Sequence, residues 1–164
     1  MLVDKEGKVL FAEELRDGMD LGDQNLRGAI FSGQALHGLE LSGADLRESD
    51  FRDSYLYWMN LFAADCSGAS FRGAVLEGAN LKSACLRYAD FTGTIIKADQ
   101  LGKASSFAHA DLSGAVLIET VVEGTEYDAE TIFPIGFDPE RHGMISVPVV
   151  DAWLIKPVCK SSQE

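Results

Sequence analysis

The sequence predicts an all-β solenoid made of square coils, and three observations support this class. A large apolar residue stands at every fifth position from residue 21 to residue 101, with Cys66 as the one small member. A small residue, usually Ala, precedes many of these centres by two positions. Four phenylalanines recur every 20 residues, at Phe31, Phe51, Phe71 and Phe91. Neither a helix, with apolar spacing near 3.6, nor a strand, with a spacing of 2, keeps a period of five.

A chain with this period can turn a corner every five residues and keep each centre pointing inward. Four corners then close a coil of 20 residues, and successive coils pair like parallel strands about 4.8 Å apart. In this arrangement the four phenylalanines form one stack on one wall of the core. The five-residue rule alone does not require their 20-residue spacing, so it independently supports four sides.

The repeated unit reads Ala-(Asp/Asn)-(Leu/Phe)-X-X, as at residues 44–48, 79–83, 89–93 and 110–114. The chain resembles the pentapeptide-repeat proteins in this unit, and the resemblance covers roughly two-thirds of the chain. The resemblance implies a right-handed quadrilateral parallel β-helix, here of about five coils. It implies little about function, because proteins with this fold have several roles.

The chain divides into an N-terminal cap at residues 1–18, the β-helix at 19–127, and a C-terminal cap and tail at 128–164. Residues 8–11 predict a short strand and 11–16 a turn or two of helix, which would cover the open first coil. After residue 101 the centres come one residue late, so we expect one extra residue within 102–106, absorbed as a bulge or widened corner.

The C-terminal part changes character. Asp138 as N-cap and Pro139 at the first helical position predict a short helix that ends at Gly143. An apolar, β-prone segment follows at residues 147–155.

Composition excludes several functions. The net charge is −12, and the acidic residues are spread along the chain without a basic footprint, which argues against direct binding of nucleic acid. No apolar run is long enough to span a membrane, and the first residues lack the pattern of a signal peptide. Three cysteines without a paired spacing favour a reducing compartment, so we expect a cytoplasmic, bacterial-type protein.

Outward positions can be sorted onto four walls, and three of these carry mixed charges. On the fourth wall, apolar residues replace the usual Asp or Asn before the centres, which is typical of a contact surface. Three interpretations stay open: the segment Val147 to Ile155 covers this wall, a second copy buries it in a homodimer, or another protein docks there. The candidate interaction surface comprises Tyr55, Tyr57, Trp58, Val75, Ile95, Val116 and Ile118.

No catalytic, metal or cofactor site emerges from the sequence. Cys66 points inward, while Cys85 and Cys159 have no metal-ligand spacing, and we expect all three to be structural. His37, His109 and His142 lie far apart in the repeat, with no recurring carboxylate or cysteine beside them. No glycine-rich loop suited to phosphate is present. We therefore expect a protein that is not an enzyme and needs no cofactor.

The sequence thus predicts a rigid solenoid that serves as a protein-interaction or structural module, with another protein or itself as partner. The resemblance implies one alternative, an acidic DNA mimic that binds or protects a bacterial topoisomerase (gyrase), as some relatives do. The acidic charge favours this alternative. Two rows of arginines interrupt the negative surface that a mimic needs. These rows contain Arg27, Arg47 and Arg87, and Arg52 and Arg72. We also expect no projecting loop, which counts against this alternative.

Overall fold

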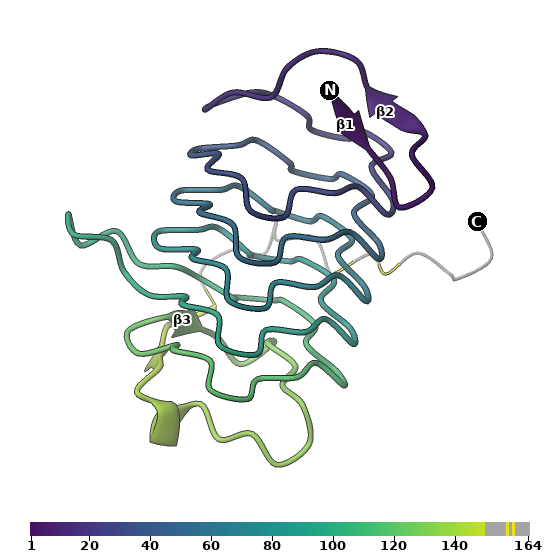
Figure 1. Cartoon of the computed structure of the whole chain (residues 1–164). Coiled ribbons are helices and arrows are strands. Elements are labelled where there is room, and N and C mark those ends of the chain that lie inside the picture. The colour runs from purple at the N-terminus through teal and green to yellow at the C-terminus, as the bar shows by residue number, and fades with distance from the viewer. Residues whose placement is uncertain (150–156, 158, 160–164) are drawn as a thin grey trace.

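The computed structural model describes residues 1–149, 157 and 159. The chain begins with β1 (Leu2–Val3) and β2 (Val9–Phe11), and it ends with β3 (Glu126–Tyr127), the 3-10 helix η1 (Glu140–His142) and β4 (Ile145–Ser146). Residues 12–125, all of them described, contain no named strand and wind as a stack of square coils (Figure 1).

The coils are held together by single-residue bridges between successive turns of the chain. Asp45 pairs in parallel with Asp65, and Asp50 with Ser70, 20 positions on in each case. The N–H of the following centre donates to the same partner, as from Leu46 N to Asp65 O at 2.7 Å. Because the chain turns a corner after each bridge, pairing does not extend into a regular strand. This explains why the sequence shows a period of five instead of two.

The inward positions form one continuous core. The centres and the small residues two positions before them are almost completely buried, as Leu46 and Ala44 illustrate. The four phenylalanines stack with ring centroids 4.6 Å, 4.8 Å and 4.8 Å apart and planes within 4° of parallel. Phe107 closes the stack edge-on, with its centroid 6.2 Å from that of Phe91.

The chain visits four walls in a fixed order, so the second wall lies opposite the fourth. We name each wall by the residues that bridge along it. These are Asp20, Glu40, Asn60, Asn80, Ser106 and Glu126 on the first wall; Asn25, Asp45, Asp65, Cys85 and Asp111 on the second; Ile30, Asp50, Ser70, Asp90 and Val116 on the Phe wall; and Ala35, Tyr55, Val75, Ile95 and Val121 on the fourth.

The expected one-residue bulge within 102–106 is wrong. Asn80 pairs with Ser106, which is 26 positions on, so six additional residues leave the coil and form a projecting loop over residues 97–105 (Figure 1). Asp99 holds this loop, because its Oδ1 accepts hydrogen bonds from Leu101 N at 2.9 Å and Lys103 N at 2.8 Å. Leu101, expected as a core centre, lies at 89% exposure in the loop.

The same insertion moves two predicted surface residues to another wall. Val116 bridges Asp90 on the Phe wall, and the Ile118 carbonyl accepts a hydrogen bond from Gly93 N on that wall. A single extra residue would place both on the fourth wall. The loop takes up five residues more than that, the length of one side, so every following residue lies one side earlier and Val121 takes the place beside Ile95 instead.

The N-terminal cap is an antiparallel hairpin of β1 and β2, in which Leu2 pairs with Phe11. The strand predicted at residues 8–11 is present as β2, but the predicted helical turn at 11–16 is absent from this fully described segment. The hairpin joins the first coil through the bridge between Asp4 and Ala29, and Leu2 is buried in the core. The cap thus covers the first coil with strand pairing instead of a helix.

The C-terminal cap continues the first wall beyond the repeat. β4 pairs in parallel with β3, so Ile145 follows Glu126 on that wall. The predicted helix is a single 3-10 turn with Pro139 as its N-cap, and Gly143 ends it with a φ of 72°. Asp138 still contributes, because its Oδ1 accepts a hydrogen bond from Arg141 N at 3.2 Å. Most of the segment 147–155 lies outside the described residues.

Candidate interaction surface

The fourth wall carries a ladder of apolar side chains on its outer face. Tyr55, Val75 and Ile95, which the sequence groups together, bridge one another in successive coils, and Val121 continues the ladder. Tyr55 is 51% exposed and Val121 43%, while Val75 and Ile95 are half-buried. Scattered exposed apolar residues are normal, but an aligned row in adjacent coils indicates a contact surface.

Three rings gather where the fourth wall turns toward the first wall. The centroid of the His37 ring lies 5.1 Å from that of Tyr57 and 6.4 Å from that of Trp58, and the Tyr57 and Trp58 centroids are 6.1 Å apart. The planes are tilted by 51° to 69°, as aromatic groups prefer. The sequence predicted Tyr57 and Trp58 here, whereas it identified no role for His37.

Trp58 occupies a strained backbone position. Its φ is 59°, in the left-handed region, where the corners directly before and after it in the stack have Gly38 and Gly78. A non-glycine residue in this region costs of order 1–3 kcal/mol relative to an unstrained backbone. The ring also lies so close to the next corner that a Cβ on Gly78 would come within 2.8 Å of Trp58 Cδ1. Eight other non-glycine corner residues, Tyr88 among them, have the same left-handed φ, and the Tyr88 ring lies equally close to Gly114 in the next coil. This backbone geometry therefore belongs to the repeat, and it places the Trp58 ring over the next corner.

The projecting loop contacts the rings through Asp99. Trp58 Nε1 donates a hydrogen bond to Asp99 Oδ2 at 2.6 Å, and this bond holds the pKa of Asp99 below its usual value. Together the loop and the wall enclose a hollow of about 390 Å³. We call it the aromatic pocket; it is lined by His37, Tyr57, Trp58, Glu77, Asp99, Gln100 and Leu101. The sequence did not identify Asp99 and Leu101 as part of this surface. The five-residue count continues to residue 101 and therefore predicts Leu101 as a core centre.

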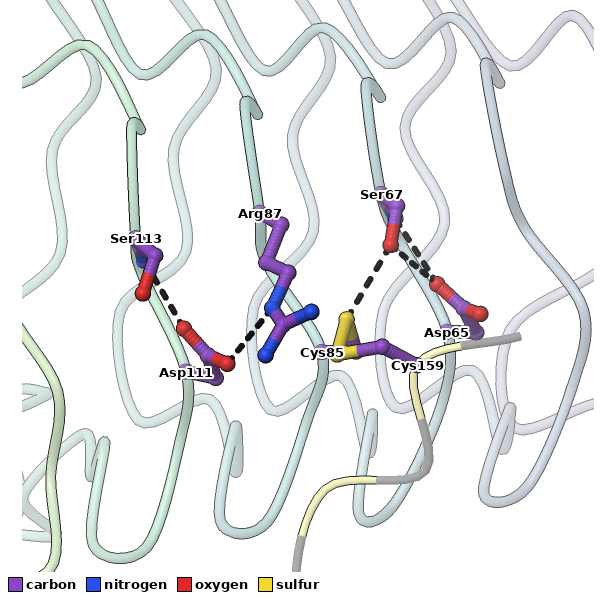
Figure 2. Close-up of a disulfide and its surroundings, with 7 residues drawn as sticks. All are labelled: Asp65, Ser67, Cys85, Arg87, Asp111, Ser113 and Cys159. Atoms are coloured by element: carbon purple, nitrogen blue, oxygen red, sulfur yellow. Dashed lines mark hydrogen bonds and ion pairs between the residues drawn. A yellow bond between two sulfur atoms is a disulfide. The ribbon is translucent and has the colours of Figure 1, made fainter. Parts of the chain in front are cut away.

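The second wall carries a disulfide between Cys85 and Cys159 (Figure 2). Cys85 is buried, and its Sγ lies 3.0 Å from Ser67 Oγ, which also donates to Asp65 Oδ1. In the next coils Arg87 Nε donates to Asp111 Oδ2 at 2.7 Å. The wall is therefore a row of paired polar groups with the chain's end attached to it.

The disulfide is a pairing that the spacing of the three cysteines did not indicate. Cys66 alone is free among them, and burial raises the pKa of its thiol. Disulfides persist in oxidising compartments, so the number and spacing of the cysteines no longer support a reducing compartment. The cytoplasmic location stays a prediction without that support. Cys159 is also bonded to the wall opposite the fourth, so this residue lies away from the apolar ladder.

The groups around His109 do not have the order of a catalytic triad. His109 Nδ1 lies against Asp128 Oδ2, and the Asp128 carboxylate also accepts a hydrogen bond from Thr131 Oγ1 at 2.9 Å. The aspartate thus stands between the other two residues, whereas nucleophilic catalysis requires the histidine in the middle. Among the described residues, no three His, Cys, Asp or Glu side chains cluster in a way that could hold a metal ion. No helix in this part of the chain has the length and apolarity to cross a membrane.

Comparisons with known proteins agree with the geometry. The family model for pentapeptide repeats matches residues 18–53 and 60–97 with eight copies. A pentapeptide repeat protein from the Arabidopsis thaliana thylakoid lumen is 31% identical, over 68% of this chain and 74% of that one, with a TM-score of 0.51. A pentapeptide repeat protein from Nostoc PCC 7120 is 28% identical, over 81% and 86% of the two chains, with a TM-score of 0.32. No curated protein matches the sequence.

Proposed function

Since the chain belongs to the pentapeptide-repeat family, whose members fold as right-handed quadrilateral β-helices, we propose that it is a non-enzymatic rod of about five coils that binds another protein. The apolar ladder on the fourth wall carries this proposal. Tyr55 and Val121 leave about half of their surface in solvent, and the aromatic pocket adjoins them. Aromatic residues are enriched where proteins bind one another.

The disulfide is compatible with a free fourth wall. Cys159 is bonded to Cys85 on the opposite wall, so Cys159 itself is held away from Tyr55 and Ile95. The interpretation in which residues 147–155 cover the ladder mostly concerns residues outside the described part. A homodimer through the same ladder remains the other form of the proposal, because a self-complementary apolar patch can pair about a twofold axis.

The acidic-mimic alternative has weaker support. Its basis is the net charge of −12, which can mimic the charge of DNA. The expectation of no projecting loop, which counted against this alternative, is wrong, because residues 97–105 form one. The arginines that interrupt this charge are paired on the surface: Arg52 contacts Asp50, Arg72 contacts Asp90, and Arg87 contacts Asp111. Such pairs make these walls close to neutral locally, whereas a DNA mimic needs a continuous negative potential.

A pair of matched variants tests the proposal. Val75→Lys with Ile95→Lys places two charges on the fourth wall, and Val116→Lys with Ile118→Lys places the same charges on the Phe wall. A photo-crosslinking amino acid at Tyr55 reports contacts in cells of the source organism, and sedimentation equilibrium reports the oligomeric state. We expect the first variant alone to lose a specific crosslink, to a partner or to a second copy. Equal crosslinking by both variants, with circular dichroism showing both folded, would contradict the proposal.

A further inference from the structure

The aromatic pocket contains a carboxylate that lacks hydrogen bonds. The Glu77 side chain is only 15% exposed, and its Oε1 forms a long ion pair with the half-exposed Lys97 Nζ at 3.5 Å, which an incoming guanidinium would join or replace. Within the part of the chain that the structure describes, no hydrogen bond reaches this carboxylate. Asp99 in the same pocket, by contrast, accepts three. Largely buried carboxylates normally accept hydrogen bonds, so Glu77 has unused capacity.

A second polar atom in the pocket is also unused. His37 Nδ1 is enclosed and, among the described residues, has no hydrogen-bond partner. The rings of Tyr57 and Trp58 lie between His37 and the two carboxylates along the lining of the hollow. The pocket therefore combines aromatic faces with an under-used negative group, which are the two features that a cation recognises.

We propose that the aromatic pocket binds an arginine side chain carried by a segment of a partner protein. A guanidinium is planar and stacks on aromatic rings, and its N–H groups bond a carboxylate in a two-pronged geometry. Tyr57 and Trp58 supply the rings, and Glu77 supplies the acceptor. A lysine ammonium is more strongly hydrated and lacks the flat face, so it fits this pocket less well.

The surroundings favour a protein segment over a free small cation. Leu101 projects beside the pocket at 89% exposure, and Tyr55 and Ile95 continue the apolar surface along the wall. An arginine flanked by apolar residues would bury these side chains together with its own methylene groups. The net charge of −12 attracts a basic segment and raises its rate of association. This inference rests on the proposed function, since it names the chemistry that the fourth wall recognises.

Intrinsic fluorescence provides a direct test. The chain has two tryptophans, so Trp153→Phe leaves Trp58 as the sole reporter. The probe is the peptide acetyl-Leu-Gly-Arg-Gly-Leu-amide, titrated at low salt against versions with lysine or citrulline in place of arginine. Citrulline keeps the shape without the charge, and we expect it to bind at least about tenfold more weakly. Acetyl-arginine amide alone, without apolar flanks, should also bind more weakly than the peptide.

A matched pair of variants locates the acceptor. Glu123 occupies the same position after its centre as Glu77, on the same wall and beyond the projecting loop. Glu77→Gln and Glu123→Gln therefore remove equal charge from one wall, in the Trp153→Phe background. We expect Glu77→Gln to weaken the arginine peptide about tenfold and to abolish its preference over citrulline, while Glu123→Gln stays within about twofold.

The opposite results would overturn the inference. These are no saturable change with the arginine peptide, equal binding of the citrulline peptide, or equal effects of the two glutamine variants. A failure of arginine recognition can be distinguished from a failure of the proposed function. If arginine recognition fails but Val75→Lys with Ile95→Lys still removes the Tyr55 crosslink, the fourth wall remains a binding surface and only its chemistry is different.

Discussion

Replacing Phe71 by alanine should destabilise the rod more than the same change at Phe31. Phe71 is completely buried, with parallel rings at 4.8 Å on both sides, Phe51 and Phe91. Removing a buried phenylalanine costs about 3–5 kcal/mol, because apolar contact is lost and a cavity remains. The rigid neighbouring coils prevent the walls from collapsing into the space, so we expect a value in the upper part of this range.

Phe31 provides the internal comparison. It is equally buried but has a single ring neighbour in the stack, Phe51 at 4.6 Å. One stacked ring pair contributes about 0.5–1.5 kcal/mol beyond the area that it buries. We therefore expect Phe71→Ala to lose about 0.5–1.5 kcal/mol more than Phe31→Ala. Phe71→Leu should recover most of the loss, since it refills the cavity without restoring the stacked faces.

Equilibrium unfolding in guanidinium chloride measures these differences. The midpoints and slopes of the wild type and the three variants should be compared at one pH, with tryptophan fluorescence and circular dichroism as two probes. Unchanged slopes indicate that the variants unfold from the same compact state. A Phe71→Ala midpoint equal to that of wild type, or a larger loss for Phe31→Ala, would refute the stacked-core reasoning.

Two further predictions concern the C-terminal part. Cys159→Ser should lower the free energy of unfolding by about 2–4 kcal/mol, because the disulfide closes a long loop in the unfolded chain. Dithiothreitol should lower the wild type to the same value and leave the variant unchanged, and a wild type insensitive to the reductant would contradict the disulfide. Burial alone would raise the pKa of Asp128, but hydrogen bonds from His109 N and Thr131 Oγ1 lower it below the ordinary 3.8. Its stabilising contribution is therefore present above pH 3.8 and lost as the pH falls through the lowered pKa, so Asp128→Asn should flatten the acid side of the stability profile. An acid limb as steep as that of wild type would rule this out.

Within the coils, the five-residue period was sufficient to predict which centres face inward, and Leu101 in the projecting loop is the exception. Burial at a centre such as Leu46 depends on the local count from one corner to the next, and that count is visible in the sequence. The phenylalanine spacing placed four rings on one wall for the same reason. The family resemblance, which is confirmed, rests on the same repeated unit.

The period could not give the wall to which a residue belongs beyond the projecting loop. Insertions of one residue and of six shift the five-residue count by the same amount, yet after the longer one every residue lies one side earlier than after the shorter one. Val116 and Ile118 kept their outward direction but changed walls for this reason. Asp99 accepts hydrogen bonds from Leu101 N and Lys103 N, and these contacts stabilise the longer insertion as a projecting loop.

The sequence by itself determined the coil, the inward direction of its centres and the apolar character of Tyr55, Val75 and Ile95. The tertiary structure alone decided which distant groups meet, namely Trp58 with Asp99 and Cys85 with Cys159. The physical reason is that periodic burial is a local property of the chain. Contacts made by a projecting loop or a returning tail depend on where those segments lie in space, and no repeat encodes that position.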